Sequence, residues 1–224
     1  EICHYLKRRQ RLEYDPNTEV MVTVGGSEAI DIALRAMLNP GDEVLIPQPS
    51  YVSYVPCTVL AGGTPVIIEL EEKDQFKLTK EKLLEKITPK TKILVLPFPN
   101  NPTGAVYSKD VLEGIVEIAR RHQLMIFADE IYDRLCMDEA EHVSIASLAP
   151  DLFCVTFSGL SKSHMIAGYR IGWMIVSGNK RLGSDFMLGV NMLSNMRLCS
   201  NVPAQSIVQT ALGGHQSVKD YVAP

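Results

Sequence analysis

The chain has 224 residues, of which 46% are hydrophobic and 21% are charged, and its net charge of −4 leaves no basic excess for binding nucleic acid. Its five cysteines are scattered and include no CxxC pair, which indicates reduced thiols in a cytoplasmic protein and gives no zinc-ligand spacing. No apolar run approaches the roughly 18 residues of a membrane span, so we expect a globular protein with one sizeable α/β core.

Both ends of the chain look like internal segments. Residues 1–9 have the pattern of the middle of an amphipathic helix and carry no initiating Met. Residues 219–224 follow another expected helix without a closing element. We therefore expect the chain to be a fragment of a longer polypeptide.

The first predicted unit has a phosphate-binding layout. Residues 20–24 are a short apolar strand that runs into Gly25-Gly26-Ser27-Glu28, and a helical pattern follows over residues 29–38. Glycines let an anion approach the backbone closely, and the amides of a helix N-terminus point toward it. Alone the pattern is weak, because a serine here is usually only a helix cap, and it matches neither GxGxxG nor the P-loop.

Strands and helices then alternate along the chain. The pattern predicts strands over residues 43–47, 64–70 and 92–97. It also predicts a helix that ends at residue 61, a helix over residues 80–87 that is capped by Thr79, and a helix over residues 109–121. This alternation predicts βαβ units and a largely parallel sheet, in which ligands bind beyond the carboxyl ends of the strands. The polar motifs follow these strand ends, so we expect a single site.

Two of these motifs allow more than one interpretation. Asn101 lies in a loop made rigid by proline and glycine, over residues 99–104, where an asparagine often bonds only its own backbone. Asp129 and Glu130 end the apolar run of residues 124–128 and could hold Mg²⁺ in a nucleotide site. Because the P-loop of such a site is missing, these carboxylates are expected to serve another ligand.

A lysine follows the next predicted strand. The β-rich run of residues 152–157 stops at Ser158-Gly159, and Lys162 lies just beyond the end of this strand. A lysine that is partly removed from water there retains more of the free amine that forms a Schiff base with an aldehyde. A lone lysine after a strand is usually a solvated surface residue, so its interpretation depends on the other motifs.

Four motifs occur in a characteristic order: Pro99-Asn-Asn-Pro-Thr-Gly104, Asp129-Glu-Ile-Tyr132, Ser161-Lys162 and Gly168-Tyr-Arg170. Together they resemble the class I/II aminotransferases of fold type I, which depend on pyridoxal 5′-phosphate (PLP). The resemblance runs from about residue 20 to residue 214. Residues 195–205 and 209–214 look most like bacterial alanine aminotransferases, whereas the region around Ser161 and His164 is closer to other subgroups.

The resemblance implies a role for each polar residue of the site. Lys162 would bind PLP covalently and transfer a proton, and Asp129 would pair with the pyridine nitrogen. Tyr132 and Asn101 would hydrogen-bond the 3′-oxygen, and Tyr51, which follows the strand of residues 43–47, would stack on the ring. The phosphate would be held by backbone amides, a hydroxyl and a guanidinium, supplied by Gly26, Ser27, Glu28 and Arg170. Lys162, Asp129 and Tyr132 form the expected catalytic set.

Two positions need a separate interpretation. Gly159 stands where many relatives carry a phosphate-binding serine, and Ser161 is its expected substitute. His164 is expected to support the site or lie at the surface rather than take part in the chemistry.

The resemblance also implies a three-layer α/β/α fold with a mostly parallel seven-stranded sheet, in which one strand is antiparallel and residues 170–176 take part. Residues 1–224 would be the large PLP-binding domain of a homodimer with its site at the subunit interface. The N-terminal segment and the C-terminal small domain, with the arginine for the substrate carboxylate, would lie outside, so we expect the fragment alone to be inactive.

Three functions are compatible with these motifs. The first is transfer of an amino group between an L-amino acid and a 2-oxo acid, with alanine, glutamate, pyruvate and 2-oxoglutarate as candidate substrates. The second is a PLP-dependent C–S β-lyase of the cystathionine type, and the third is a non-catalytic PLP-sensing domain of a regulator. No basic helix-turn-helix is visible in the sequence, which argues against the regulator. The lyase stays open because the same cofactor site serves both reactions, and the resemblance favours the aminotransferase.

Overall fold

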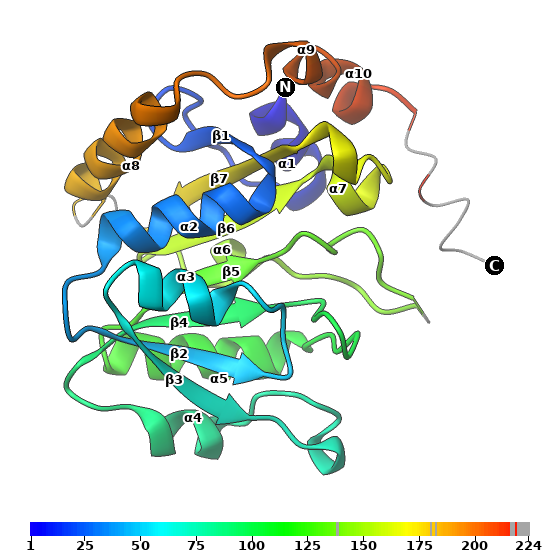
Figure 1. Ribbon diagram of the computed structural model, residues 1–224. Coiled ribbons are helices and arrows are strands. Elements are labelled where there is room, and N and C mark those ends of the chain that lie inside the picture. The colour runs from blue at the N-terminus through cyan, green and yellow to red at the C-terminus, as the bar shows by residue number, and fades with distance from the viewer. Residues whose placement is uncertain (138, 180, 182, 216–217, 219–224) are drawn as a thin grey trace.

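The computed structural model describes residues 1–137, 139–179, 181, 183–215 and 218 (Figure 1). One sheet of seven strands, in the order β1-β7-β6-β5-β4-β2-β3, lies at its centre. The strands are β1 Val20–Val24, β2 Glu43–Gln48, β3 Thr64–Glu69, β4 Thr91–Pro97, β5 Met125–Asp129, β6 Cys154–Gly159 and β7 Ile171–Ser177. Only β7 runs against both of its neighbours, and the remaining pairs are parallel, which confirms the predicted sheet.

Helices cover both faces of the sheet (Figure 1). They are α1 Ile2–Gln10, α2 Gly25–Met37, α3 Tyr54–Leu60, α4 Lys80–Lys86, α5 Lys109–Arg121, α6 Ile145–Leu148, α7 Leu160–Ser163, α8 Ser184–Arg197, α9 Val202–Gln205 and α10 Val208–Gly213, with 3₁₀ turns η1 Glu72–Asp74 and η2 Ala167–Tyr169. Within the described residues, no helix is both long and apolar enough to cross a membrane.

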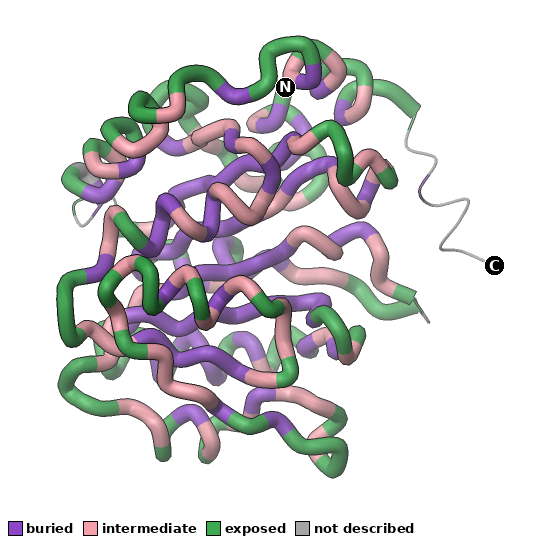
Figure 2. Tube along the Cα trace, viewed as in Figure 1, coloured by how far each residue is buried: buried purple, intermediate pink, exposed green. Residues whose placement is uncertain are grey.

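Strand β4 shows why the sheet is covered on both sides. Its side chains alternate, so Ile93 and Val95 pack in the core beneath α2, α3 and α8, whereas Leu94 and Leu96 pack in the core beneath α4, α5 and α6. A third cluster joins β7 to α1, α9 and α10. The five inner strands are accordingly buried along most of their length, whereas the edge strands β1 and β3 have one buried residue each (Figure 2). The three-layer α/β/α arrangement is confirmed.

Most predicted boundaries are correct to within two residues, and the cap of α4 is confirmed because Thr79 Oγ1 accepts a hydrogen bond from Lys82 N. The start of α2 was predicted wrongly, since the helix begins at Gly25 and not at residue 29. Gly172 of β7 lies so close that a Cβ on it would meet the backbone of Gly25 and Gly26. Gly25 has a φ of 76°, a conformation that favours glycine, and a Cβ on it would strike the guanidinium of Arg170. The predicted chain end over residues 219–224 lies outside the described residues.

The strand directions bring the motifs to one edge of the sheet. Strands β1, β2, β4, β5 and β6 all end there. Because β7 is antiparallel, its first residue, Ile171, lies at the same edge, and Arg170 directly precedes it. Segments from six strands thus meet at one place.

Candidate active site

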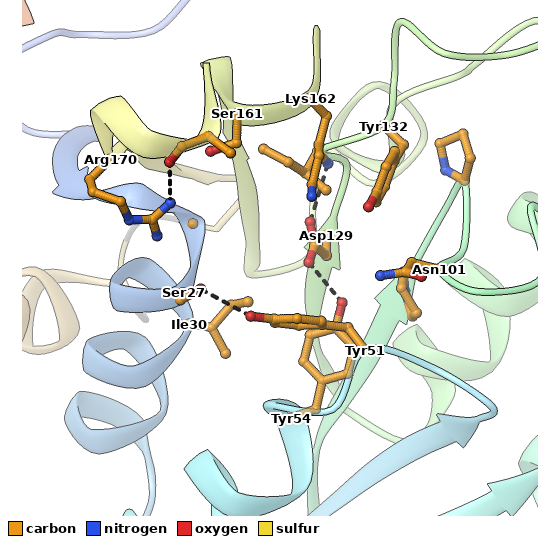
Figure 3. Close-up of a pocket in the computed structure, with 15 residues that line it drawn as sticks. Ser27, Ile30, Tyr51, Tyr54, Asn101, Asp129, Tyr132, Ser161, Lys162 and Arg170 are labelled. Atoms are coloured by element: carbon orange, nitrogen blue, oxygen red, sulfur yellow. Dashed lines mark hydrogen bonds between the residues drawn. The ribbon is translucent and has the colours of Figure 1, made fainter. Parts of the chain in front are cut away.

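A cavity of about 190 Å³ opens at this edge of the sheet (Figure 3). Nine of the ten predicted site residues line it: Gly26, Ser27, Tyr51, Asn101, Asp129, Tyr132, Ser161, Lys162 and Arg170. The tenth, Glu28, does not line the cavity, and its expected role through the backbone amide stays a prediction. Its carboxylate accepts a 2.6 Å hydrogen bond from Val24 N and forms an ion pair with Arg197 of α8, so its side chain does not reach the cavity.

Asp129, at the end of β5, is the buried acid of the cavity. Tyr54 Oη donates a 2.7 Å hydrogen bond to its Oδ2, and the Ile131 N–H donates a 3.2 Å bond to its Oδ1. Burial raises the pKa of Asp129, while these two donors and the nearby positive charge of Lys162 oppose that rise. Burial also raises the pKa of Tyr54 well above its ordinary value, so Tyr54 keeps its proton and acts as the donor.

Lys162 reaches into the cavity from α7, the short helix that follows β6. Its Nζ lies 5.6 Å from the centroid of the Tyr132 ring, and the side chain points toward Asp129 (Figure 3). An amine from the segment after β6 therefore faces a phenol and a buried carboxylate that both come from the end of β5.

His164, two residues after the lysine, points away from the cavity. Its Nε2 lies 2.8 Å from the carbonyl oxygen of Ala211 and its Nδ1 lies 2.8 Å from Ser163 Oγ. A carbonyl only accepts, so Nε2 carries the proton, and burial lowers the pKa of the imidazole. His164 thus joins α7 to α10 and does not line the cavity.

The other end of the cavity is suited to an anion. The first turn of α2 supplies Gly26 and Ser27, and the guanidinium of Arg170 packs so closely against Gly25 that a Cβ there would strike it. A Cβ on Gly26 would meet nothing within 4 Å, so this residue borders open space. Helix N-terminal amides and a guanidinium together form a strong phosphate-binding arrangement.

Two loops complete the walls. Tyr51 packs edge-on against Tyr54, with ring centroids 5.7 Å apart, and its hydroxyl lies 3.2 Å from Ser27 Oγ. In the loop after β4, Asn100 donates to the carbonyl of Pro49, which lies in the loop after β2, and to Thr103 Oγ1 of its own loop. The neighbouring Asn101 lines the cavity with its side chain (Figure 3). Of the two asparagines, Asn101 is therefore the one that faces the cavity.

Gly159 is explained by packing. A Cβ on it would lie 2.6 Å from the carbonyl oxygen of Ile171 and 2.9 Å from Gly172 Cα, so the closely paired strands β6 and β7 leave no room for a serine. Ser161 lines the cavity on the same side as Arg170 (Figure 3). That it replaces the missing serine stays a prediction.

The sequence interpretation missed several lining residues, of which Tyr54 is the most important. A second tyrosine three residues after Tyr51 was a usable signal, because that spacing places two side chains on one side of a helical turn. The remaining missed residues are apolar or contribute backbone: Ile30, Pro97, Pro99, Ile131 and Ala167.

Fold and site together define an α/β protein of the aminotransferase type. The sequence pattern of the family described as aminotransferase class I and II matches residues 1–223. The chain belongs to this family, whose members use PLP.

Named relatives agree with this assignment. The chain is 51% identical over 206 residues to the alanine aminotransferase of Mycobacterium tuberculosis, covering 92% of this chain and 48% of the relative. It is 48% identical over 222 residues to the glutamate-pyruvate aminotransferase AlaA of Escherichia coli, covering 99% and 54%. A crystal structure of an aminotransferase from Escherichia coli superposes with a TM-score of 0.95 at 46% identity, covering 99% and 55%. The chain thus spans about half the length of the curated relatives it matches.

Proposed function

We propose that this chain forms the PLP-binding domain of an aminotransferase that moves an amino group between an L-amino acid and a 2-oxo acid. The observation that carries the proposal is that Lys162, Asp129 and Tyr132 face one cavity whose far end is the N-terminus of α2 with Arg170. The names of the relatives support alanine and glutamate as amino donors, with pyruvate and 2-oxoglutarate as acceptors.

The residues present fit PLP at each of its polar positions. Gly26, Ser27 and Arg170 would hold the phosphate, for which the open space beside Gly26 leaves room. Asp129, kept in place by Tyr54 and Ile131, would pair with the protonated ring nitrogen. Tyr132 and Asn101 would hydrogen-bond the 3′-oxygen, Tyr51 would stack on the ring, and Ser161 would add a hydroxyl near the phosphate. When bound, PLP supplies an electron-withdrawing ring that stabilises negative charge at the substrate carbon.

The chain itself supplies binding, orientation and proton transfer. Lys162 would hold the cofactor through Nζ and, once displaced by the substrate amine, would carry a proton at Nζ as general base and then general acid. The pyridine nitrogen keeps its proton only beside an ionised carboxylate, so Tyr54 favours the reaction by donating to Asp129.

A second copy of the chain is the partner we propose, with the site at the interface of a homodimer. Helix α8 supports this, because Leu188, Met192 and Met196 follow one another at four-residue spacing and are 61%, 63% and 80% exposed. Such an apolar stripe on one helix is typical of an interface. The five free cysteines support a reducing compartment, and we propose the cytoplasm.

The proposal is tested with the purified full-length protein and a panel of L-amino acids, each with 2-oxoglutarate or pyruvate. Formation of a new amino acid and a new 2-oxo acid in equal amounts is expected. Release of pyruvate and ammonia from cystathionine, without an oxo-acid acceptor, would instead identify a C–S β-lyase. PLP binding with neither reaction would favour a non-catalytic PLP-sensing domain.

A further inference from the structure

Glu130 follows Asp129 directly but does not line the cavity. Its side chain is buried, and its Oε1 accepts two 3.0 Å hydrogen bonds, from Ser144 Oγ and from the Ile145 N–H. These bonds connect the end of β5 to the start of α6. They therefore hold together the two ends of the intervening loop, which carries Tyr132.

The second oxygen of Glu130 faces an imidazole. Oε2 lies 3.5 Å from His142 Nε2, and neither atom has a hydrogen-bond partner among the described residues, although both are buried. A carboxylate oxygen and an unprotonated imidazole nitrogen are both acceptors, so the pair needs a proton between them. A small rotation of either side chain then brings the two atoms to ordinary hydrogen-bond distance.

The surroundings decide which of the two groups holds that proton. Burial is the largest cause and disfavours the charged form of each group; the negative charges of Asp133 and Asp129 further disfavour a charged carboxylate, and the positive charge of Arg9 further disfavours an imidazolium. Together with burial, these charges raise the pKa of Glu130 to about 8 and lower the pKa of His142 to about 4.

The other two titratable groups that face the carboxyl add no charge, because burial raises the pKa values of Tyr14 and Cys154 and keeps both protonated. The proton therefore stays on the carboxyl, which donates it to the neutral imidazole.

His142 also packs against the segment that follows β4. Its ring stacks on Phe98, with centroids 5.1 Å apart and planes 22° apart. Phe98 is fully buried, and its N–H donates a 3.1 Å hydrogen bond to the carbonyl of Asp129. Phe98 directly precedes the loop that carries Asn101. The contacts Glu130–His142–Phe98 thus connect the loop of Tyr132 to the loop of Asn101.

We propose that Glu130 is a positioning residue that acts as a neutral carboxylic acid, hydrogen-bonded to His142, and holds the loops of Tyr132 and Asn101 in place around the cofactor site. A neutral Glu130 also leaves Asp129 as the one acid of the adjacent pair that ionises. Divergent environments for two neighbouring acids are the usual means of assigning them different roles. The inference rests on the proposed function for the ligand, whereas the protonation of Glu130 is independent of it.

Two substitutions of Glu130 separate this role from a general loss of stability. Glu130→Gln keeps an oxygen for Ser144 and Ile145 and supplies an N–H for His142, so it copies the protonated acid and not the carboxylate. We expect its dissociation constant for PLP, titrated by absorbance, to stay within about twofold of wild type. Glu130→Ala, which removes all three bonds, should weaken PLP binding about tenfold. Glu113→Ala, which removes an exposed carboxylate on α5, is the control and should change nothing.

A spectroscopic measurement decides the protonation state directly. At neutral pH the infrared difference spectrum between wild type and Glu130→Gln should contain the C=O band of a protonated carboxylic acid. In His142→Phe, which retains an aromatic ring beside Phe98 but removes Nε2, that band should shift because its hydrogen bond is lost. If Glu130→Ala does not fold, the PLP affinity of His142→Phe tests the positioning role instead.

Different results would overturn different parts of the proposal. A Glu130→Gln variant that binds PLP as weakly as Glu130→Ala, or a carboxylate band in place of the acid band, would overturn the neutral pair. Wild-type affinity in Glu130→Ala and His142→Phe would overturn the positioning role. If the wild-type protein binds no PLP, the proposed function fails, and the infrared band still tests the pair.

Discussion

The hydroxyl of Tyr54 donates a 2.7 Å hydrogen bond to Oδ2 of Asp129, and both side chains are buried. Tyr54 begins α3, which follows β2, and Asp129 ends β5, so the bond spans β4, the strand between them in the sheet. A buried carboxylate is stabilised in its ionised form by such a donor. Tyr54 therefore controls the charge of the group that we propose to pair with PLP.

Tyr54→Phe should weaken PLP binding and shift its pH dependence. A hydrogen bond to a charged group contributes about 1.5–3 kcal/mol, so the loss should raise the dissociation constant about tenfold or more. Because the pKa of Asp129 would rise further, binding should be lost at a higher pH on acidification than in wild type. The measurement is an absorbance titration with PLP at several pH values.

Tyr107→Phe is a matched control for this experiment, because Tyr107 is also buried but its hydroxyl accepts from Leu78 N and does not line the cavity. It should lower stability without moving the pH at which PLP binding is lost. An unchanged pH midpoint in Tyr54→Phe would exclude the proposed control of Asp129.

Lys162→Ala should abolish covalent attachment of PLP while leaving the other contacts. In wild type, borohydride reduction should join PLP irreversibly to Lys162, identified by mass spectrometry of the peptides. In the variant, PLP should be removable by dialysis after the same treatment. Lys109→Ala, at an exposed lysine on α5, should behave as wild type. Covalent PLP in reduced Lys162→Ala would show that another amine holds the cofactor.

Gly159→Ala should destabilise the fold. The new Cβ would lie 2.6 Å from the Ile171 carbonyl oxygen, and β7 cannot retreat without breaking its ladder with β6. Overpacking of this kind costs about 1–3 kcal/mol, measured as the free energy of unfolding in urea. Gly168→Ala is the control, since a Cβ there meets nothing within 4 Å. Equal stability of the two variants would mean that the strands adjust freely.

Much of the fold could be predicted because its signals are local. Strands such as β4 and β5 are apolar runs bounded by proline, glycine or charged residues, and their alternation with helices requires a mainly parallel sheet. The position of the site followed, because parallel strands end at a common edge. Nine of ten site residues line the cavity for this reason.

The features that could not be predicted depend on contacts between distant segments. That Tyr54 meets Asp129 depends on the strand order β5-β4-β2, which no local pattern contains. The close approach of Gly172 to Gly25 and Gly26 is likewise a contact between distant segments that no local pattern contains. Glu28 follows Ser27 in the sequence, but one helical residue turns the side chain by about 100°, which directs it toward Arg197 and not into the cavity.

The neutral pair of Glu130 and His142 should leave a signature in the pH dependence of stability. The pKa of Glu130 is about 8 in the folded protein against an ordinary value of 4.5, so between these limits the folded state holds a proton that the unfolded chain releases. Its contribution to stability is therefore present at low pH and lost as the pH rises to 8. The pKa of His142 is about 4 in the folded protein against an ordinary value of 6.5, so between these limits it is the unfolded chain that binds the extra proton. The contribution of His142 to stability therefore rises with pH up to 6.5.

These two contributions oppose each other between pH 4.5 and 6.5, where both groups differ in protonation between the folded and unfolded states. From pH 6.5 to 8 only the Glu130 contribution remains, so the unfolding free energy of wild type should fall relative to that of Glu130→Gln, with a limiting slope of about 1.4 kcal/mol per pH unit. Urea unfolding of both proteins at half-unit pH steps measures the difference, and Glu113→Gln controls for removal of an exposed carboxylate. Parallel curves for wild type and Glu130→Gln from pH 6.5 to 8 would mean that Glu130 is already ionised in the folded protein, because only a retained proton produces the slope.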